Sequence, residues 1–218
     1  MNFLSHYHVH SRDEHEFNFG LLFPDFLGIL NRDYKLGQYK TDYKGPSNHF
    51  IKGMDYHVRA DAYWHDCIYF KEKCQLLKEV FSSFGFAERP YRPFFMTHVA
   101  LELLIDRQLV REKEGICEDM YHSLANVDTV FLEGLFQKQS ETDRMLNFLK
   151  NFIDNRYVFS YGDNEMFVYA LNRLFSRIGH PQLTFSNEEN RDTFVDQLDH
   201  AVKKDYSTIL ETISHEVQ

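Results

Sequence analysis

Apolar residues recur along most of this chain at the three- and four-residue spacing of amphipathic helices, whereas alternating apolar and polar runs are scarce. Only five prolines and ten glycines interrupt this pattern. The periodicity predicts about seven helices, which we place at residues 14–31, 48–84 with one break, 94–113, 118–137, 141–155, 164–178 and 186–215. Residues 32–47 are rich in Tyr, Lys and Gly and are predicted to form a loop.

No internal repeat or low-complexity linker divides these helices. We therefore expect one compact multi-helix domain of the all-α class over residues 1–218. Ser186 and Glu189 form a capping-box pattern that predicts the start of the last helix. Pro24 is expected to kink the first helix or to begin a new turn.

Two of the predicted helices carry potential metal ligands at every fourth position. They are His57, Asp61 and His65 on one helix, and His98, Glu102 and Asp106 on the other. Residues four apart lie on one face of a helix, with Cβ atoms roughly 6 Å apart. Two such faces turned toward each other place about six nitrogen and oxygen donors in one interhelical space. This donor set suits a divalent metal ion.

We call each of these two sets of three residues a ladder. The second ladder, on the helix of His98, has an alternative explanation. Its polar residues lie in an apolar helix, where carboxylates and imidazoles are costly to bury unless they are paired or metal-bound. A buried His–Glu pair, or pairing of Asp106 with Arg107 or Arg59, would satisfy them without metal. On the first ladder, His65 is also suited to orienting a ligand or contacting substrate.

Residues outside the ladders extend the candidate site. Asp25 lies in the apolar segment GLLFPDFLG, where its carboxylate needs a metal ion or, at a helix N-cap, backbone N–H groups. His6 and His8, near the N-terminus, are further potential ligands. Arg59 has the planar guanidinium that suits a phosphate group.

Charge and cysteine content restrict the function classes. The net charge is −9 without a long basic run, which disfavours nucleic acid as a partner. Three cysteines without regular spacing argue against a disulfide framework. No apolar run approaches the ~18 residues of a membrane span, and the first residues lack the pattern of a signal peptide. We therefore expect a soluble, cytoplasmic protein with no membrane span. Motifs for a covalent nucleophile are absent, so metal-activated water is the expected chemistry.

At these motifs the chain resembles the acyl carrier protein phosphodiesterase family, a group of all-helical proteins related to HD-type metal-dependent phosphohydrolases. MNFLSH resembles that family's M-N-F-L-A-H, GLLFPDF its G-N-L-L-A-D-F, GMDYHVRAD its G-I-x-x-H-R-x-I-D, and THVAL its D-H-F-L. The matches lie within about the first 110 residues. They carry over the motif aspartates and histidines onto Asp25, His57, Asp61 and His98.

The resemblance implies an HD-like helical bundle that hydrolyses the phosphodiester between 4'-phosphopantetheine and a serine of acyl carrier protein. A divalent metal, Mn, Zn or Fe, would be the cofactor, and acyl carrier protein or a small phosphodiester the partner. The expected metal ligands are Asp25, His57, Asp61 and His98, with His6, His8 and Asp106 as further candidates. Glu102 or His65 would orient the water or protonate the leaving group, and Arg59 would bind a phosphate oxygen.

Three alternatives stay open. The segment FNFGLLFPDFLG also resembles the G-x-x-x-P-D segment of zinc-dependent phospholipase C-like helical proteins. Thr97 stands where the phosphodiesterase family has Asp, which favours an inactive relative that binds a small ligand or protein partner, unless Glu102 replaces the missing ligand. A non-haem iron carboxylate protein is less favoured because the E-x-x-H spacing of such bundles is missing.

Overall fold

A computed structural model of the chain describes residues 1–30, 48–86, 88, 91–136, 138–177 and 179–217. All regular secondary structure in these residues is helical, which confirms the predicted all-α fold. None of the described helices combines the length and the apolar character that crossing a lipid bilayer requires. The likeness to an HD-type bundle stays a prediction, and the predicted loop at residues 32–47 lies outside the described residues.

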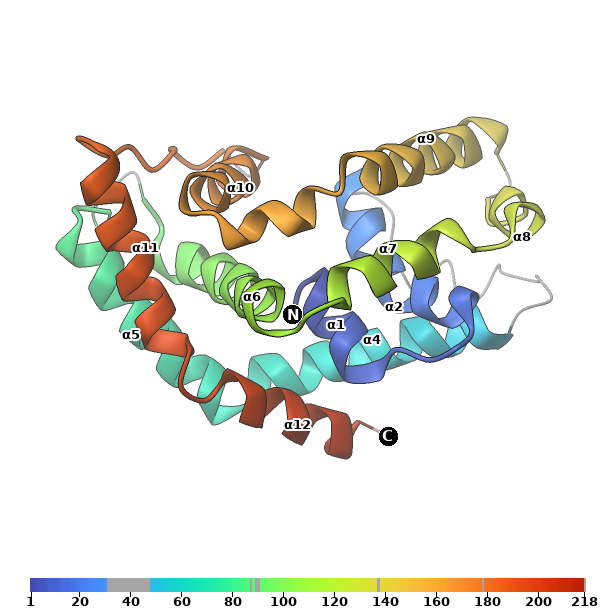
Figure 1. Cartoon of the computed structure of the whole chain (residues 1–218), viewed down its shortest axis with the longest axis horizontal. Helices are drawn as coiled ribbons and strands as arrows, with labels where there is room; N and C mark the ends of the chain where they lie inside the picture. Colours follow the sequence, from blue (N-terminus) through green and yellow to red (C-terminus); the bar gives the residue numbers. More distant parts are fainter. Residues whose placement is uncertain (31–47, 87, 89–90, 137, 178, 218) are drawn as a thin grey trace.

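The helices divide into two sets along the chain. The first set carries the candidate site and consists of α1 (Phe3–His10), α2 (His15–Leu30), α4 (Asn48–Asp66), α5 (Ile68–Ser83) and α6 (Pro93–Glu112). The second set consists of α7 (Ile116–Ala125), α8 (Thr129–Glu133), α9 (Gln139–Asn155), the 3-10 helix η1 (Tyr157–Gly162), α10 (Asn164–Arg177), α11 (Glu188–Val202) and α12 (Tyr206–Glu216). In Figure 1, α4 and α5 lie below α6, α9 and α10 lie above it, and the N-terminus is near the middle.

Most helix positions agree with the sequence pattern, and the exceptions have local causes. The expected break in residues 48–84 falls at Cys67, between α4 and α5. The predicted helix 118–137 is instead two helices, because Asp128 accepts hydrogen bonds from the N–H groups of Val130 and Phe131 and starts α8. Pro24 is accommodated inside α2.

The end of the chain also differs from its prediction. The expected helix 186–215 is two helices, α11 and α12. The capping-box assignment to Ser186 was wrong, because the N-cap is the next residue, Asn187, whose side chain accepts a hydrogen bond from the Asn190 N–H. Short helices α1 and η1 were not predicted, since eight and six residues give too little periodicity to recognise.

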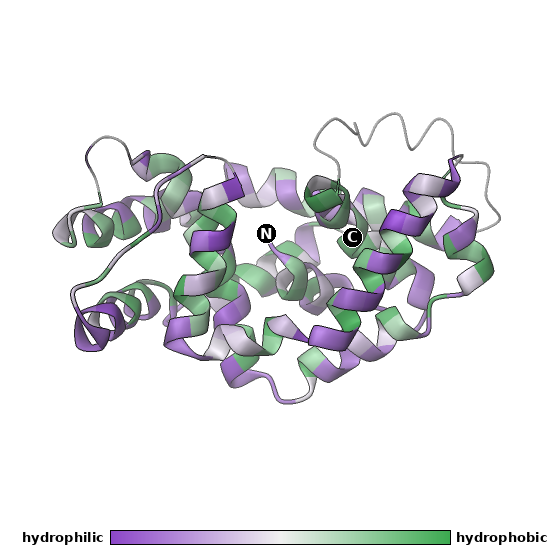
Figure 2. Cartoon of the chain, turned by 90° about the horizontal axis from the view of Figure 1, so that it is seen from above, coloured by the Kyte–Doolittle hydropathy of each residue, from purple (hydrophilic) through white to green (hydrophobic). Residues whose placement is uncertain are grey.

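Aromatic side chains dominate the core that these helices enclose. Phe17, Phe19, Phe23, Phe26 and Trp64 are completely buried and belong to one continuous hydrophobic cluster that reaches from α1 to α12. Figure 2 shows hydrophobic residues mixed with hydrophilic ones along most helices, the amphipathic pattern expected of helices that pack on a common core. Burial of this apolar surface is the main stabilising contribution to such a fold.

Two glycines allow α2 and α4 to approach closely. A Cβ atom on Gly20 would lie 2.3 Å from the carbonyl oxygen of Phe50, and one on Gly53 would lie 2.2 Å from that of Phe17. Real Cβ atoms do not approach a carbonyl oxygen this closely, so each position requires glycine. The close crossing brings the backbone of α2 next to the ligand-bearing face of α4.

A buried guanidinium ties α6 to the second set of helices. Arg107 is fully buried, and its Nε donates to both carboxylate oxygens of Asp199 at 3.0 and 3.1 Å. Its Nη1 donates to the carbonyl oxygen of Tyr161 at 2.6 Å, and the side-chain amide of Gln108 also donates to Asp199. The pairing of Asp106 with Arg107 that the sequence suggested is therefore wrong, because Asp199 on α11 takes that place.

Candidate metal centre

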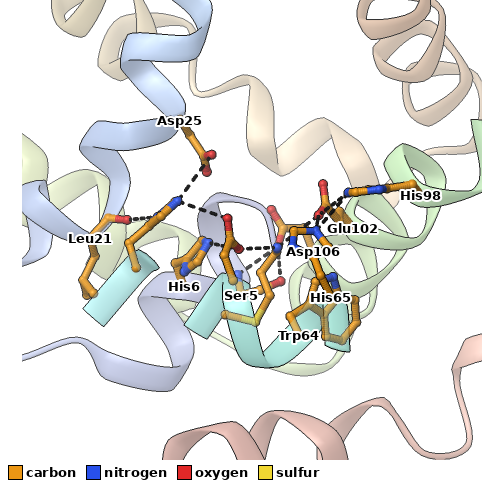
Figure 3. A network of polar contacts seen from close by, with 12 residues as sticks. Ser5, His6, Leu21, Asp25, Trp64, His65, His98, Glu102 and Asp106 are labelled. Atoms are coloured by element: carbon orange, nitrogen blue, oxygen red, sulfur yellow. Dashed lines mark hydrogen bonds and ion pairs between the residues drawn. The ribbon is translucent and has the colours of Figure 1, made fainter. Parts of the chain in front are cut away.

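Three helices bring a first group of ligands together. His6 comes from α1, Asp25 from α2, and His57 and Asp61 from α4 (Figure 3). Nε2 of His6 lies 3.2 Å from Oδ1 of Asp61, and Nε2 of His57 lies 3.4 Å from Oδ2 of the same carboxylate. Asp25 Oδ1 lies 3.9 Å from His57 Nε2. We call these four residues the first cluster.

The ring orientation of His57 is fixed by the backbone of α2. Its Nδ1 donates to the carbonyl oxygen of Leu21 at 2.7 Å, which leaves Nε2 facing Asp61 and Asp25. Metal-binding histidines commonly donate their second nitrogen in this way, which fixes the tautomer. His57 is thus oriented as a ligand.

Several potential ligand atoms of the first cluster have no hydrogen-bond partner of adequate geometry among the described residues. Both ring nitrogens of His6 and Oδ2 of Asp25 are buried atoms of this kind. The ring of His6 stacks on that of His57 with centroids 3.8 Å apart, so both Nε2 atoms approach one carboxylate. Unpaired buried polar atoms are costly, and a cation between them would remove that cost.

A second group of ligands lies between α4 and α6. Nε2 of His65 is 3.0 Å from Nε2 of His98 and 3.3 Å from Oε1 of Glu102, and Nε2 of His98 is 3.1 Å from that same oxygen. We call these three residues the second cluster. Ligands at the ~2.1 Å distances of zinc coordination are about 3.3 Å apart in a tetrahedral shell, so the donors of this cluster are already spaced as metal ligands.

The N-terminal ammonium of Met1 lies between the two clusters. It donates to Oδ1 of Asp61 at 2.8 Å and to Oε1 of Glu102 at 3.1 Å. Burial disfavours its charge, but the carboxylates of Glu102 and Asp61 outweigh burial and raise the pKa of the amino group to about 11. The space between the clusters therefore stabilises positive charge.

The environment keeps the carboxylates of Asp61 and Glu102 ionised and the imidazole of His6 neutral. For His57, burial disfavours the charged ring, but Asp25 and Asp61 outweigh burial and raise its pKa. Burial, followed by the charge of His57, lowers the pKa of His6 to about 3. For Glu102 and Asp61, burial opposes ionisation, but the Met1 ammonium and hydrogen bonds from histidines hold the pKa of each well below its usual range. Neutral imidazole and ionised carboxylate are the forms that bind metal.

Asp25 differs from the other carboxylates. Burial, opposed by His57 and reinforced by Asp61, raises the pKa of Asp25 to about 7. Within the part of the chain that the structure describes, no hydrogen-bond donor contacts Oδ2 of Asp25 to offset the loss of water. The interpretation of Asp25 as a helix N-cap does not hold, because Asp25 lies in the interior of α2.

Asp106 does not join either cluster. Its carboxylate accepts hydrogen bonds from the backbone N–H groups of Leu4 and Ser5, at 3.1 and 2.8 Å, and from the Ser5 hydroxyl. Asn2, the N-cap residue of α1, makes no side-chain capping bond, so Asp106 supplies the cap from α6. The proposed metal role of Asp106 is replaced by a structural one, which holds the helix that carries His6.

Two further candidates lie away from the clusters. Arg59 is exposed and its guanidinium lies 4.4 Å from the centre of the Tyr56 ring, on the side of α4 that faces His10. His8 is half-buried and lines a separate surface cavity together with Lys113. Neither residue is in contact with the ligand clusters.

The structure adds two groups that the sequence did not reveal. The Met1 ammonium and the Leu21 carbonyl are backbone atoms, and no residue pattern marks them. The sequence indicates them only indirectly, because Met1 and Leu21 lie within the motif segments MNFLSH and GLLFPDF. Thr97, the substituted position, is buried and donates its hydroxyl to the carbonyl of Phe94, while Glu102 lies beside His98 as a ligand would.

The clusters are open to solvent on one side. The exposed fractions of the side chains are 26% for Asp25, 30% for Asp61, 28% for His98 and 38% for His65. Figure 3 shows the ligands in a row from Asp25 at one end to His98 at the other. Side chains at both ends of the row are therefore partly exposed.

Comparison with known proteins adds no relative: no family model, no curated protein and no solved structure matches the chain.

Proposed function

We propose that this protein is a metal-dependent phosphodiester hydrolase that holds two divalent ions side by side. The observation that carries the proposal is the pair of groups with two histidines and a carboxylate each, His6, His57 and Asp61, and His65, His98 and Glu102. In each group the potential ligand atoms lie within 4.8 Å of one another. Two histidines and one carboxylate are a ligand set of hydrolytic zinc sites.

Different residues of the two clusters have different roles in the proposed reaction. Bound divalent ions would polarise the phosphodiester and promote attack by water. Asp25 faces the first cluster from α2 and keeps Oδ2 without a hydrogen-bond partner, so it can complete the ligand set or accept a proton there. Glu102 and His65 were expected to orient the water or protonate the leaving group. In this arrangement they would instead bind the second ion. We assign Arg59 no part in this arrangement, because its guanidinium lies over the Tyr56 ring.

The resemblance to acyl carrier protein phosphodiesterases supports the same reaction class. Its motif residues Asp25, His57, Asp61 and His98 all belong to the two clusters. We infer that the substrate is a phosphodiester such as the 4'-phosphopantetheine linkage of acyl carrier protein. Mn, Zn or Fe would serve as the ion, since imidazole and carboxylate ligands suit each of them.

Metal content and hydrolysis together test this proposal. Purified protein should contain two equivalents of metal by elemental analysis and should hydrolyse bis(p-nitrophenyl) phosphate after loading with Mn, Zn or Fe. His57→Ala and His98→Ala should each remove one equivalent. His200→Ala, an exposed histidine on α11, is the matched control and should retain both. Protein that binds none of the three ions and stays inactive with each would contradict the proposal.

A non-catalytic relative is the second candidate. It is favoured by the Met1 ammonium, which already supplies a positive charge between Asp61 and Glu102. In that case His98→Ala would change the melting temperature equally with and without added metal. A metal-dependent rise in melting temperature that is lost in His98→Ala would exclude this candidate.

A further inference from the structure

A cavity of about 430 Å³ lies between α10, η1, α9 and the N-terminal segment. In Figure 1 these helices are on the side of α6 opposite α4. Its walls include Phe3, Ile29, Phe148, Tyr157 and Leu174. A cavity of this volume is within the range that binds small organic molecules, and its walls are mainly apolar and aromatic, as such sites usually are.

The charge of this cavity is opposite to that of the protein. Among the described residues, the charged ones that line it are Arg173 and Arg177, although the chain as a whole has a net charge of −9. The two arginines are four residues apart and share one face of α10. Arg173 is exposed and makes no hydrogen bond or ion pair with a described residue. A guanidinium of this kind is suited to binding an anion.

The same face of α10 carries exposed apolar surface. Tyr169 is 55% exposed and Met166 is 40% exposed, and both line the cavity at helical spacing from Arg173. Exposed large apolar side chains that gather at a cavity mark a place where an apolar group binds. The face therefore combines a site for an anion with a site for an apolar body.

The cavity adjoins the ligand clusters along the chain. Asn2 and Phe3 line it and directly follow Met1, whose ammonium bonds Asp61 and Glu102. Leu103 also lines it and is the neighbour of Glu102 on α6. The cavity and the clusters thus share the N-terminal segment and α6 as walls.

From these observations we propose that the cavity binds an organic anion with an apolar or aromatic body, whose anionic group is held by Arg173 and Arg177. This anion is the organic part of the substrate, a statement that rests on the proposed function. The substrate class is then a phosphodiester whose organic part carries a second negative charge. The binding itself needs no metal and no hydrolysis.

A pair of fluorescent probes with one body and different charge tests the binding. Anilinonaphthalene sulfonate carries the anion, and N-phenylnaphthylamine has the same aromatic body without it. In metal-free protein, Arg173→Gln combined with Arg177→Gln should weaken binding of the sulfonate about tenfold and change binding of the neutral probe less than about twofold. Arg144→Gln, an exposed arginine on α9, is the charge-matched control and should change neither.

Filling the cavity gives the complementary result. Ala170→Trp places a large ring on the lining face of α10 and should weaken both probes, with circular dichroism to verify that the helices remain. Sulfonate binding that is unchanged in the double arginine variant would overturn the anion site.

Inhibition kinetics separate this inference from the proposed function. In the metal-loaded protein, the sulfonate should inhibit hydrolysis of bis(p-nitrophenyl) phosphate competitively, with an inhibition constant equal to its Kd. Sulfonate that binds in the cavity without inhibiting would contradict its assignment to the substrate. Protein that binds the sulfonate but hydrolyses nothing would keep the anion site and overturn the hydrolase.

Discussion

His57 donates its Nδ1–H to the backbone carbonyl of Leu21 at 2.7 Å, although 36 residues separate them in the sequence. This bond leaves Nε2 facing two carboxylates, so one contact between α2 and α4 sets the direction of a proposed metal ligand. It depends on how closely the two helices approach.

Gly53→Ala should lower the free energy of unfolding by about 1–3 kcal/mol, because the new methyl group would meet the Phe17 carbonyl oxygen at 2.2 Å. Separation of the helices should also weaken metal binding, since Leu21 moves away from His57. Gly28→Ala is the control: nothing lies within 4 Å of a Cβ there, so it should be neutral or stabilise by up to about 1 kcal/mol. Urea unfolding measures the free energy of unfolding of both variants. Equal values for Gly53→Ala and Gly28→Ala would contradict the steric argument.

Asp106→Ala should destabilise the fold by about 3 kcal/mol, because it leaves the N–H groups of Leu4 and Ser5 buried without an acceptor. Asp106→Asn keeps one acceptor oxygen and should cost about half as much. Asp196→Ala, at an exposed position of α11, should change stability by less than about 0.5 kcal/mol. If Asp106→Ala behaves like Asp196→Ala in thermal unfolding, Asp106 does not cap α1.

Asp199→Ala should destabilise by about 3–5 kcal/mol, because it removes the acceptor of the buried Arg107 guanidinium. Arg107→Met in the same chain should recover part of this loss, since no charge is then buried alone. The exposed pair Lys150–Asp154 provides the comparison, and Lys150→Ala should cost less than about 0.5 kcal/mol. Additive effects of the Asp199 and Arg107 changes in a double-mutant cycle would show that the pair is not coupled.

The stability of the fold should depend on the protonation of His10. Burial, with the nearby Arg59 and Arg12 charges, lowers the pKa of His10 to about 4. The unfolded chain binds this proton near pH 6.5, so the contribution is complete above that pH and is lost as pH falls toward 4. The loss is at most about 3 kcal/mol.

A neutral side chain at the same position isolates this effect. His10→Gln should have a free energy of unfolding that changes less than wild type between pH 6.5 and about 4, measured with urea at several pH values. Parallel curves for the two proteins would show that His10 does not titrate on unfolding in this range.

The sequence predicted the two ladders but not their division into two clusters. Residues eight positions apart on a helix are about 12 Å apart along its axis, too far to bind the same ion. His57 and His65 therefore belong to different clusters, and Asp61, between them, faces the first. The same spacing separates His98 from Asp106, which reaches α1 instead.

Contacts that backbone atoms make with side chains of the site could not be predicted. The helices were recognisable because each buries a long apolar face, whereas the Leu21 carbonyl acts through its position alone. Arg59 illustrates the opposite error: its side chain has the right chemistry for phosphate, but it is two residues from His57 and so on another face of α4.

The shared helix α4 makes the two clusters thermodynamically dependent on each other. It supplies His57 and Asp61 to the first and His65 to the second, while α6 supplies the rest of the second and holds α1, and with it His6, through Asp106. On the proposed function, an ion bound at either cluster would order the helices that form the other. Occupancy should therefore be cooperative, and the coupling must be reciprocal: each ion raises the affinity for its neighbour by the same factor.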